Sequence, residues 1–304
     1  MGLLTGSASI TRYHAFGPVD GPDFELERFI EIQPGSEVRE RIGFIPFEPE
    51  APYEVGARRY AFRVRIDKLR PDPTAVKERL KQLIHTEIET TDATFVGPKK
   101  RKQLRELAEE ELIVKATPRT KIIECCLEGD LLYIANTSKN VLGVILELLR
   151  KVGVTAEPKA PWLDRADPDV ESELVTPNQP GQSVLGCRFL KALMEDRELM
   201  IEGEAGNVRL ATAQAKVSLS GAVLGDLHRY VERGCEILSA KIITAETTFR
   251  FDALSYRING LRVETDRHDH WTELLDERLE KIGAMYELLD QKYEGLAAQI
   301  LAMN

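Results

Sequence analysis

The side chains with the clearest capacity for chemistry are cations that gather in one segment of the sequence. Residues 58–121 hold 17 Lys and Arg against 10 Asp and Glu, a net charge of +7, so the other residues carry −16 of the formal total of −9. Such a segment can bind phosphate oxygens, while repulsion by the acidic remainder restricts where a polyanion can sit. The candidate residues for this surface are Arg59, Arg63, Arg65, Lys99, Lys100, Arg101, Lys102, Arg105, Arg119 and Lys121.

A second group of side chains could hold a metal ion. Glu264, Asp266, His268, Asp269 and His270 follow one another closely, and the two histidines could ligate a divalent metal for phosphodiester hydrolysis. Nuclease sites usually assemble carboxylates from several strands, and no such set stands out. The alternative is an acidic, solvated loop that leads into the last helix, with Asp269 near the N-cap. We therefore expect no metal site, and keep His268 and His270 as the alternative ligands.

Short motifs of several enzyme classes are absent from the sequence. It has no P-loop, no Gly-x-Gly-x-x-Gly after a strand, no Gly-x-Ser-x-Gly and no His-Glu-x-x-His. We therefore expect neither catalytic residues nor a cofactor.

Composition limits the class of protein. Hydrophobic residues make up 43% and charged residues 30% of 304 residues, which is typical of a globular chain with more than one core. No stretch approaches the ~20 consecutive apolar residues of a membrane span, and the first ten residues lack a signal-peptide pattern. Cysteines at 125, 126, 187 and 235 form no metal or disulfide pattern, so we expect buried thiols in a cytoplasmic protein without a membrane partner.

The first element that must position the cations is a strand over Tyr60–Lys68. Its apolar residues alternate with Arg59, Arg63 and Arg65, so one face packs and the other presents guanidinium groups. Neighbouring groups on that face would lie about 7 Å apart, the two-residue repeat of a strand. The alternative interpretation is that exposed arginines protect a sheet edge.

The second element is a helical hairpin. Asp72 and Pro73 begin one helix, Gly97-Pro98 breaks the chain, and a second helix runs from Lys99 toward Lys115 with Leu104, Leu107, Ala108 and Leu112 on its apolar stripe. Residues 99–102 are four consecutive cations on the first turn, where the helix dipole disfavours positive charge. An external anion would explain them. Aromatic residues are scarce in this segment, which favours contact with duplex phosphates over base stacking.

The remaining pattern predicts an α+β fold of mixed antiparallel sheets with the hairpin projecting from it. The other elements that we expect are a strand at 7–14, a short helix at 24–32, an apolar turn at 43–47, a hairpin at 122–136, a helix at 138–153, a Pro-rich linker at 155–182, strands at 199–214, a helix capped by Ser220 that ends at Gly234, three strands at 235–263 and a long helix from Trp271. The apolar stripe of the last helix is either core or a dimer seam.

The order of these motifs resembles the RdgC family of bacterial recombination-associated proteins over most of the chain. The matching stretches are Gly-Phe-Ile-Pro at 43–46, Lys-Leu-Arg-Pro-Asp-Pro at 68–73, the lysine-rich helix that ends before Pro-Arg at 118–119, Leu-Leu-Tyr-Ile at 131–134, Ser-Lys at 138–139 and Leu-Leu-Arg-Lys at 148–151. This chain departs from the family at Thr120-Lys121, where the family has Ala-Phe and uses the aromatic residue in a dimer contact. The family's C-terminal Phe-Asp-Ala-Asp-Phe segment is also absent.

The resemblance implies an RdgC-like protein that binds DNA without sequence preference and is not an enzyme. It implies a ring-shaped homodimer that encircles double-stranded DNA, associates with the nucleoid and indirectly restrains recombinase filaments; single-stranded DNA is the alternative ligand. The expected parts are a central α+β domain of residues 1–71 with 118–158, the hairpin of residues 72–117 as a tip, and an α+β base domain of residues 159–304. The family is also labelled exonuclease, for which this chain offers no residue set.

Two other functions stay open on the sequence. One is a metal-dependent nuclease that would use Glu264, Asp266, His268 and His270. The other is a structural scaffold whose basic segment binds an acidic protein partner.

Overall fold

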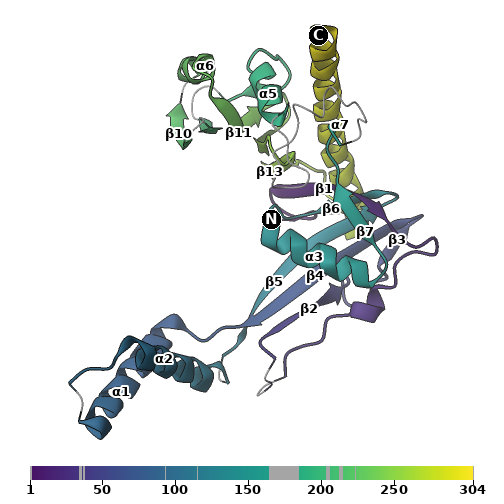
Figure 1. Ribbon diagram of the computed structural model, residues 1–304. Helices are drawn as coiled ribbons and strands as arrows, with labels where there is room; N and C mark the ends of the chain where they lie inside the picture. Colours follow the sequence, from purple (N-terminus) through teal and green to yellow (C-terminus); the bar gives the residue numbers. More distant parts are fainter. Residues whose placement is uncertain are drawn as a thin grey trace. The chain divides into compact units, whose positions relative to one another are not determined.

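Alternating apolar and polar residues give this chain a large antiparallel sheet, and helices complete an α+β fold (Figure 1). The computed structural model describes residues 2–33, 36, 38–92, 94–114, 116–163, 185–202, 206–211, 215–222 and 224–303. The chain forms two compact units, each made of several segments. Unit 1 contains Met1–Pro22, Glu48–Phe62 and Ile123–Asn304, and unit 2 contains Asp23–Phe47 and Arg63–Ile122.

Unit 1 holds most of the strands. They are β1 (Ala8–Phe16), β3 (Glu54–Gly56), β6 (Leu131–Ile134), β7 (Thr155–Pro158), β8 (Met200–Ile201), β9 (Gly206–Ala211), β10 (Lys216–Ala222), β11 (Glu236–Ile243), β12 (Thr248–Asp252) and β13 (Arg257–Leu261), together with parts of β4 (Arg59–Leu69) and β5 (Pro118–Glu128). Their hydrogen-bonded order is β10-β9-β11-β12-β13-β1-β6-β5-β4, and β3, β7 and β8 pair with β4, β1 and β11.

Strand β1 joins the two ends of the chain within unit 1. Its first residues pair with β13, with Ala8 opposite Leu261, and its later residues pair with β6, with Thr11 opposite Ile134. Because of these ladders, the first 22 residues and the C-terminal half form one unit.

The core of unit 1 lies along its longest helix. The helices are α3 (Lys139–Lys151), α5 (Leu185–Ala192), α6 (Leu224–Glu232) and α7 (Trp271–Met303). On α7, Leu275, Leu279, Ile282, Leu289 and Tyr293 are almost fully buried, so at these positions the stripe is core, one of the two alternatives that the sequence left open. Rings of Trp162, Phe189, Phe251, Tyr256 and Tyr293 pack against one another, mostly edge to face.

Unit 2 combines a small part of the sheet with the helical hairpin. Its elements are η1 (Phe24–Glu27), β2 (Glu40–Ile45), α1 (Pro73–Thr91), α2 (Pro98–Ile113) and the adjoining parts of β4 and β5. Strands β2 and β4 are antiparallel with Gly43 opposite Arg65. A Cβ atom on Gly43 would lie 2.4 Å from the Cα of Phe29, so the close approach of that segment requires glycine.

The predicted hairpin of two helices is present in unit 2. The side chain of Asp72 accepts hydrogen bonds from the backbone N–H groups of Thr74 and Ala75 and caps α1. Figure 1 shows α1 and α2 side by side, and Leu104 and Ala108 of α2 are buried. Leu107, expected on the same apolar stripe, is 43% exposed.

Several local predictions are wrong, each because pairing or capping overrides the local pattern. The segment at 24–32 forms only one helical turn, and the apolar residues at 43–45 continue β2 instead of turning. Ser220 lies in β10 and caps nothing, since α6 begins at Leu224. Most of the expected linker at 155–182 lies outside the described residues, while its first part forms β7.

Two further predictions concern cysteines and membranes. Cys125, Cys126 and Cys187 are free and buried, as expected, whereas Cys235 is half-buried. No described helix combines the length and the apolar character that crossing a bilayer requires.

Candidate nucleic-acid interface

The start of α2 is a strongly electropositive end of a helix. Gly97 is the N-cap and supplies no side-chain hydrogen bond, and the first turn contains no acidic residue. Lys99 and Arg101 are exposed on this turn, and within the described part of the chain neither side chain has a hydrogen bond or an ion pair. Their charges add to the positive end of the helix dipole without internal compensation. An anion from outside the chain is therefore favoured here.

The neighbouring cations of the hairpin have carboxylate partners. The pairs are Lys100 with Glu87 at 3.0 Å, Lys102 with Glu106 at 3.9 Å and Arg105 with Glu109 at 3.0 Å. All three basic side chains remain largely exposed, so each pair is weak and can exchange its carboxylate for another anion. These residues can contribute to an interface only by giving up a carboxylate partner, whereas Lys99 and Arg101 have no such partner to lose among the described residues.

Strand β5 adds a second pair of free cations to unit 2. Arg119 and Lys121 are two residues apart, so they project from the same face of the strand. Both are exposed, and neither side chain has a polar partner among the residues that the structure describes. Lys121 therefore presents a solvated charge on this face of the strand.

The arginines of β4 differ from this pattern because each has partners within its own unit. Arg59 donates to Glu128 and to Asp276, which lie 69 and 217 residues away in the sequence. Arg63 donates from Nε and Nη2 to the carbonyl oxygen of Pro46 at 3.0 and 2.7 Å. The strand itself is confirmed, but the row of guanidinium groups that we expected on one face is tied down by internal contacts.

Arg65 has the most complete set of contacts. It forms two hydrogen bonds with the buried Asp67, at 3.0 and 2.7 Å, and its guanidinium carbon lies 4.4 Å from the centre of the Phe29 ring. Glu31 lies 3.5 Å away on the exposed side. Burial would raise the pKa of Asp67, but hydrogen bonds from Arg65 and Thr120 outweigh burial and lower it. Arg65 therefore holds a buried carboxylate in its charged form.

Four further cations are exposed and were missing from the predicted set. Arg58, Arg70, Lys77 and Lys81 have no side-chain partner within the described ranges. Lys77 and Lys81 are spaced i, i+4 on α1, an arrangement of like charges that disfavours the isolated helix. This spacing was the sequence signal that could have identified Lys77 and Lys81.

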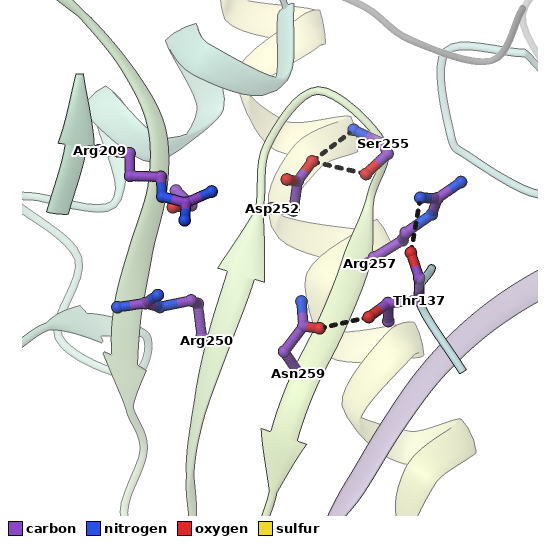
Figure 2. Close-up of a pocket in the computed structure, with 8 residues that line it drawn as sticks. Thr137, Arg209, Arg250, Asp252, Ser255, Arg257 and Asn259 are labelled. Carbon is purple, nitrogen blue, oxygen red and sulfur yellow. Dashed lines mark hydrogen bonds between the residues drawn. The ribbon is translucent and has the colours of Figure 1, made fainter. Parts of the chain in front are cut away.

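Unit 1 contains a polar pocket with a volume of about 320 Å³, which sequence reasoning missed (Figure 2). Three arginines come to it from separate strands: Arg209 from β9, Arg250 from β12 and Arg257 from β13. Their flanking residues are apolar and buried, so an inward and outward alternation was visible in the sequence. The strand register that brings the three arginines together could not be seen in the sequence.

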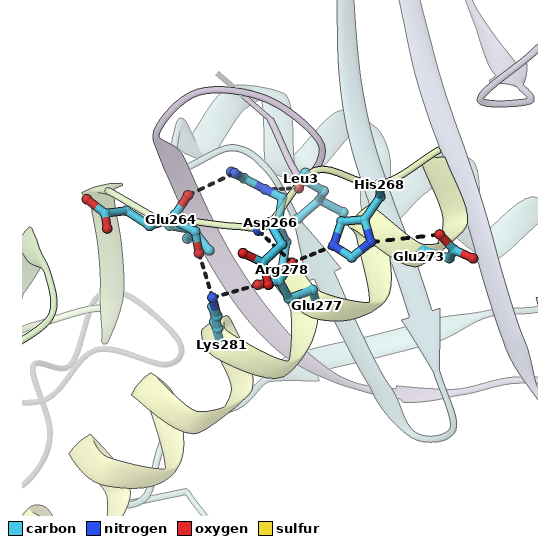
Figure 3. A network of polar contacts seen from close by, with 9 residues as sticks. Leu3, Glu264, Asp266, His268, Glu273, Glu277, Arg278 and Lys281 are labelled. Atoms are coloured by element: carbon cyan, nitrogen blue, oxygen red, sulfur yellow. Dashed lines mark hydrogen bonds and ion pairs between the residues drawn. The ribbon is translucent and has the colours of Figure 1, made fainter. Parts of the chain in front are cut away.

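The predicted metal ligands occupy a different kind of site. His268 Nε2 lies 2.6 Å from Glu277 Oε2, and Lys281 donates to the other oxygen of Glu277 at 2.6 Å (Figure 3). The carbonyl oxygen of Glu264 accepts a hydrogen bond from Lys281, and the backbone N–H of Asp266 donates to Glu277. In the part of the chain that the structure describes, no three His, Cys, Asp or Glu side chains are grouped to hold a metal ion. The contacts correspond to the expected polar loop before the last helix.

We expect the His268–Glu277 pair to be visible in a pH titration. The hydrogen bond to Glu277 raises the pKa of His268, and His268 and Lys281 lower the pKa of Glu277 to about 2. The stabilising effect of His268 should be complete below its ordinary pKa of about 6.5 and should disappear as pH rises through its raised pKa. The stabilising effect of Glu277 should be complete above about pH 4.3 and should decrease as pH falls toward about 2.

The measurement is an NMR titration of the His268 ring in the native protein and in Glu277→Gln. The variant should bring the pKa of His268 back toward about 6.5, whereas Glu280→Gln, an exposed change on the same helix, should leave it raised. An unaltered pKa in Glu277→Gln would show that the pair does not form in solution.

Comparison with the known family models and with curated proteins finds no match for this chain.

Proposed function

We propose that this protein binds DNA through its phosphate backbone without sequence preference. One observation carries the proposal: Lys99, Arg101, Arg119 and Lys121 of unit 2 are exposed and have no internal partner within the described residues, although the chain as a whole is acidic. Exposed cations without internal partners create a local positive potential on an otherwise acidic protein and are available to the phosphate oxygens of an external polyanion. Lys and Arg bound to phosphates release condensed counterions, which drives binding of any duplex sequence.

Double-stranded DNA fits this surface better than single-stranded DNA. Proteins that bind single strands stack successive bases on several aromatic side chains. Among the large exposed apolar side chains described in unit 2, Phe95 is the aromatic one, at 75% exposure. One ring next to a cluster of cations does not provide a stacking path, so we propose that duplex phosphates are the ligand.

The finer proposal is an RdgC-like ring-shaped homodimer that encircles DNA and thereby restrains recombinase filaments at the nucleoid. The order of motifs in the sequence supports it, as does the net charge of +7 on residues 58–121 of an otherwise acidic chain. In this proposal the acidic remainder faces away from DNA. Lys121 would replace an aromatic dimer contact, so ring closure would depend on other residues.

The test combines binding, topology and mass in one buffer. Two duplexes of unrelated sequence should bind equally, with affinity that decreases linearly in log salt, and closed circular DNA should retain the protein longer than linear DNA with free ends. Mass measurement should give a dimer. Failure to bind random duplex would overturn the proposal, and equal retention on circles and linear DNA would overturn encirclement.

The same samples distinguish the other functions. Incubation of DNA with the protein and Mg²⁺ or Mn²⁺ should leave the DNA intact, and cleavage would favour the nuclease. A scaffold for an acidic protein would not shift random duplex DNA at any salt concentration.

A further inference from the structure

The polar pocket of unit 1 has more positive charge than its own residues neutralise. Besides Arg209, Arg250 and Arg257, it contains a single carboxylate, Asp252. One oxygen of Asp252 accepts hydrogen bonds from the backbone N–H and hydroxyl of Ser255, at 2.9 and 2.5 Å. The carboxylate therefore caps the turn between two strands and forms no ion pair with an arginine among the described residues.

Register explains why these side chains share one face. Antiparallel pairing places Arg209 opposite Ser239, Ser239 opposite Asp252, and Asp252 opposite Arg257, so the four form a row across β9, β11, β12 and β13. Arg250 lies two residues from Asp252 and therefore on the same face. Figure 2 shows Arg209 and Arg250 on one side of Asp252 and Arg257 on the other. The buried residues that alternate with them pack into the core on the opposite face.

Among the described residues, none of the three guanidinium groups has a carboxylate partner. Arg250 donates there to the carbonyl oxygen of Asn207, at 3.1 Å. Arg257 donates to the carbonyl oxygen of Thr137, at 3.1 Å, and contacts the hydroxyl of Tyr13, while its buried Nε has no hydrogen-bond partner. The side chain of Arg209 has no polar partner in the described part of the chain.

From this geometry we propose that the pocket binds the phosphate group of a small phosphorylated molecule. Three guanidinium groups against one carboxylate leave a net charge of +2, which matches the charge of about −1.5 to −2 on a phosphate monoester at pH 7. Arginine is suited to phosphate because its planar group offers several donors to adjacent oxygens. The hydroxyl of Ser239, whose residue is only 4% exposed, lies in the middle of the row.

The shape of the site favours a small ligand over a nucleic acid. Its volume of about 320 Å³ falls at the lower end of the ~300–1,000 Å³ typical of pockets for small molecules. Proteins contact the phosphates of duplex DNA through exposed side chains that reach the DNA backbone. In this pocket, by contrast, Ser239 and the Nε of Arg257 are buried. The residues of the site all belong to unit 1, whereas the free cations that carry the DNA proposal belong to unit 2.

The experiment measures binding of inorganic phosphate, pyrophosphate and a nucleoside monophosphate to the full chain by calorimetry, at constant ionic strength set with chloride. Thermal unfolding followed by tryptophan fluorescence gives a second readout, because both tryptophans, Trp162 and Trp271, belong to unit 1. At least one of the three ligands should bind and raise the unfolding temperature. Which of them binds best identifies whether a free phosphate, a diphosphate or a nucleotide is the source.

Arg209→Gln is the test variant because this side chain has no polar partner to lose among the described residues. It should weaken the best ligand about tenfold or more, the typical effect of removing one charge-assisted hydrogen bond. Arg229→Gln makes the same change of charge at an exposed position of α6 and should bind like the native protein. Without ligand, Arg209→Gln should be at least as stable as the native protein, since it reduces repulsion between arginines.

Three results would overturn the proposal. They are no binding of any phosphate ligand, an equal loss in Arg209→Gln and Arg229→Gln, and a dicarboxylate that binds as tightly as the best phosphate. Competition between random duplex DNA and the phosphate ligand, lost in Arg209→Gln, would instead assign the pocket to DNA. A change of Lys99, Arg101, Arg119 and Lys121 to Gln should leave phosphate binding intact, so the two proposals can fail separately.

Discussion

Replacing Lys99, Arg101, Arg119 and Lys121 together with Gln should lower the affinity for random duplex DNA about a thousandfold at ~0.1 M salt. Each phosphate contact contributes about 0.9 to the slope of log K against log salt, so the loss of four should flatten that slope by about 3.6. Because phosphate contacts carry no sequence information, the loss should be the same for every duplex. These four residues lose no internal hydrogen bond or ion pair among the described residues, so the fold should persist.

The matched control removes four exposed cations from unit 1: Lys191, Lys216, Arg229 and Arg233. It changes the net charge by the same amount, so it reports the general effect of a more acidic protein. Fluorescence anisotropy at five or more salt concentrations gives both slopes. Equal slopes for the two quadruple variants would refute the assignment of the interface to unit 2, and an unchanged slope in the first variant would remove the basis of the DNA proposal.

Replacing Arg278 with Met should destabilise unit 1 by about 3–5 kcal/mol in the free energy of unfolding. Arg278 on α7 is only 3% exposed, and its guanidinium group donates to the carbonyl oxygen of Leu3 (Figure 3) and to those of Gly6 and Val263. Burial lowers its pKa, but an ordinary value near 12.5 leaves the group charged at neutral pH. The methionine would fill similar space while leaving three carbonyl groups without this donor, which is the costly outcome.

Urea denaturation followed by tryptophan fluorescence measures this effect in unit 1, which contains both tryptophans. Lys281→Met is the control, since it removes an exposed cation three residues further along α7 and should shift the midpoint far less. Arg278→Lys should fall between the two because a single ammonium group cannot reach all three carbonyl oxygens with the geometry of a guanidinium. A midpoint in Arg278→Met equal to that of Lys281→Met would show that the network contributes little.

Local periodicity predicted the elements whose residues contact near neighbours. The strand at Tyr60–Lys68, the helical hairpin and the apolar stripe of α7 all follow from spacing alone, because each buries one face. Spacing gives the face of a side chain but not its partner. Arg59 and Arg65 were expected to be available to an anion, yet their carboxylates come from other parts of the fold or from the next outward position of the same strand.

The missed pocket has the same physical origin. Arg209, Arg250 and Arg257 are separated by dozens of residues or by a turn, and only the register of β9, β11, β12 and β13 places them together. A shift of one residue in any of these ladders would send an arginine into the core. Similarly, Arg278 is a cation within an apolar helix stripe, and its role depends on carbonyl groups that lie more than 270 residues earlier in the chain.

The position of β1 has a consequence for how this chain folds as it is made. The partner of Thr11 is available once Ile134 has been synthesised, but Ala8 must wait for Leu261. At roughly 5–20 residues per second, synthesis of the chain from Ala8 to Leu261 takes on the order of 10–50 s. During this time the first residues of β1 have an unpaired edge, and unpaired strand edges are a known route to aggregation. Contacts this distant in sequence also slow refolding, so a chaperone that shields nascent edges should raise the yield of native protein.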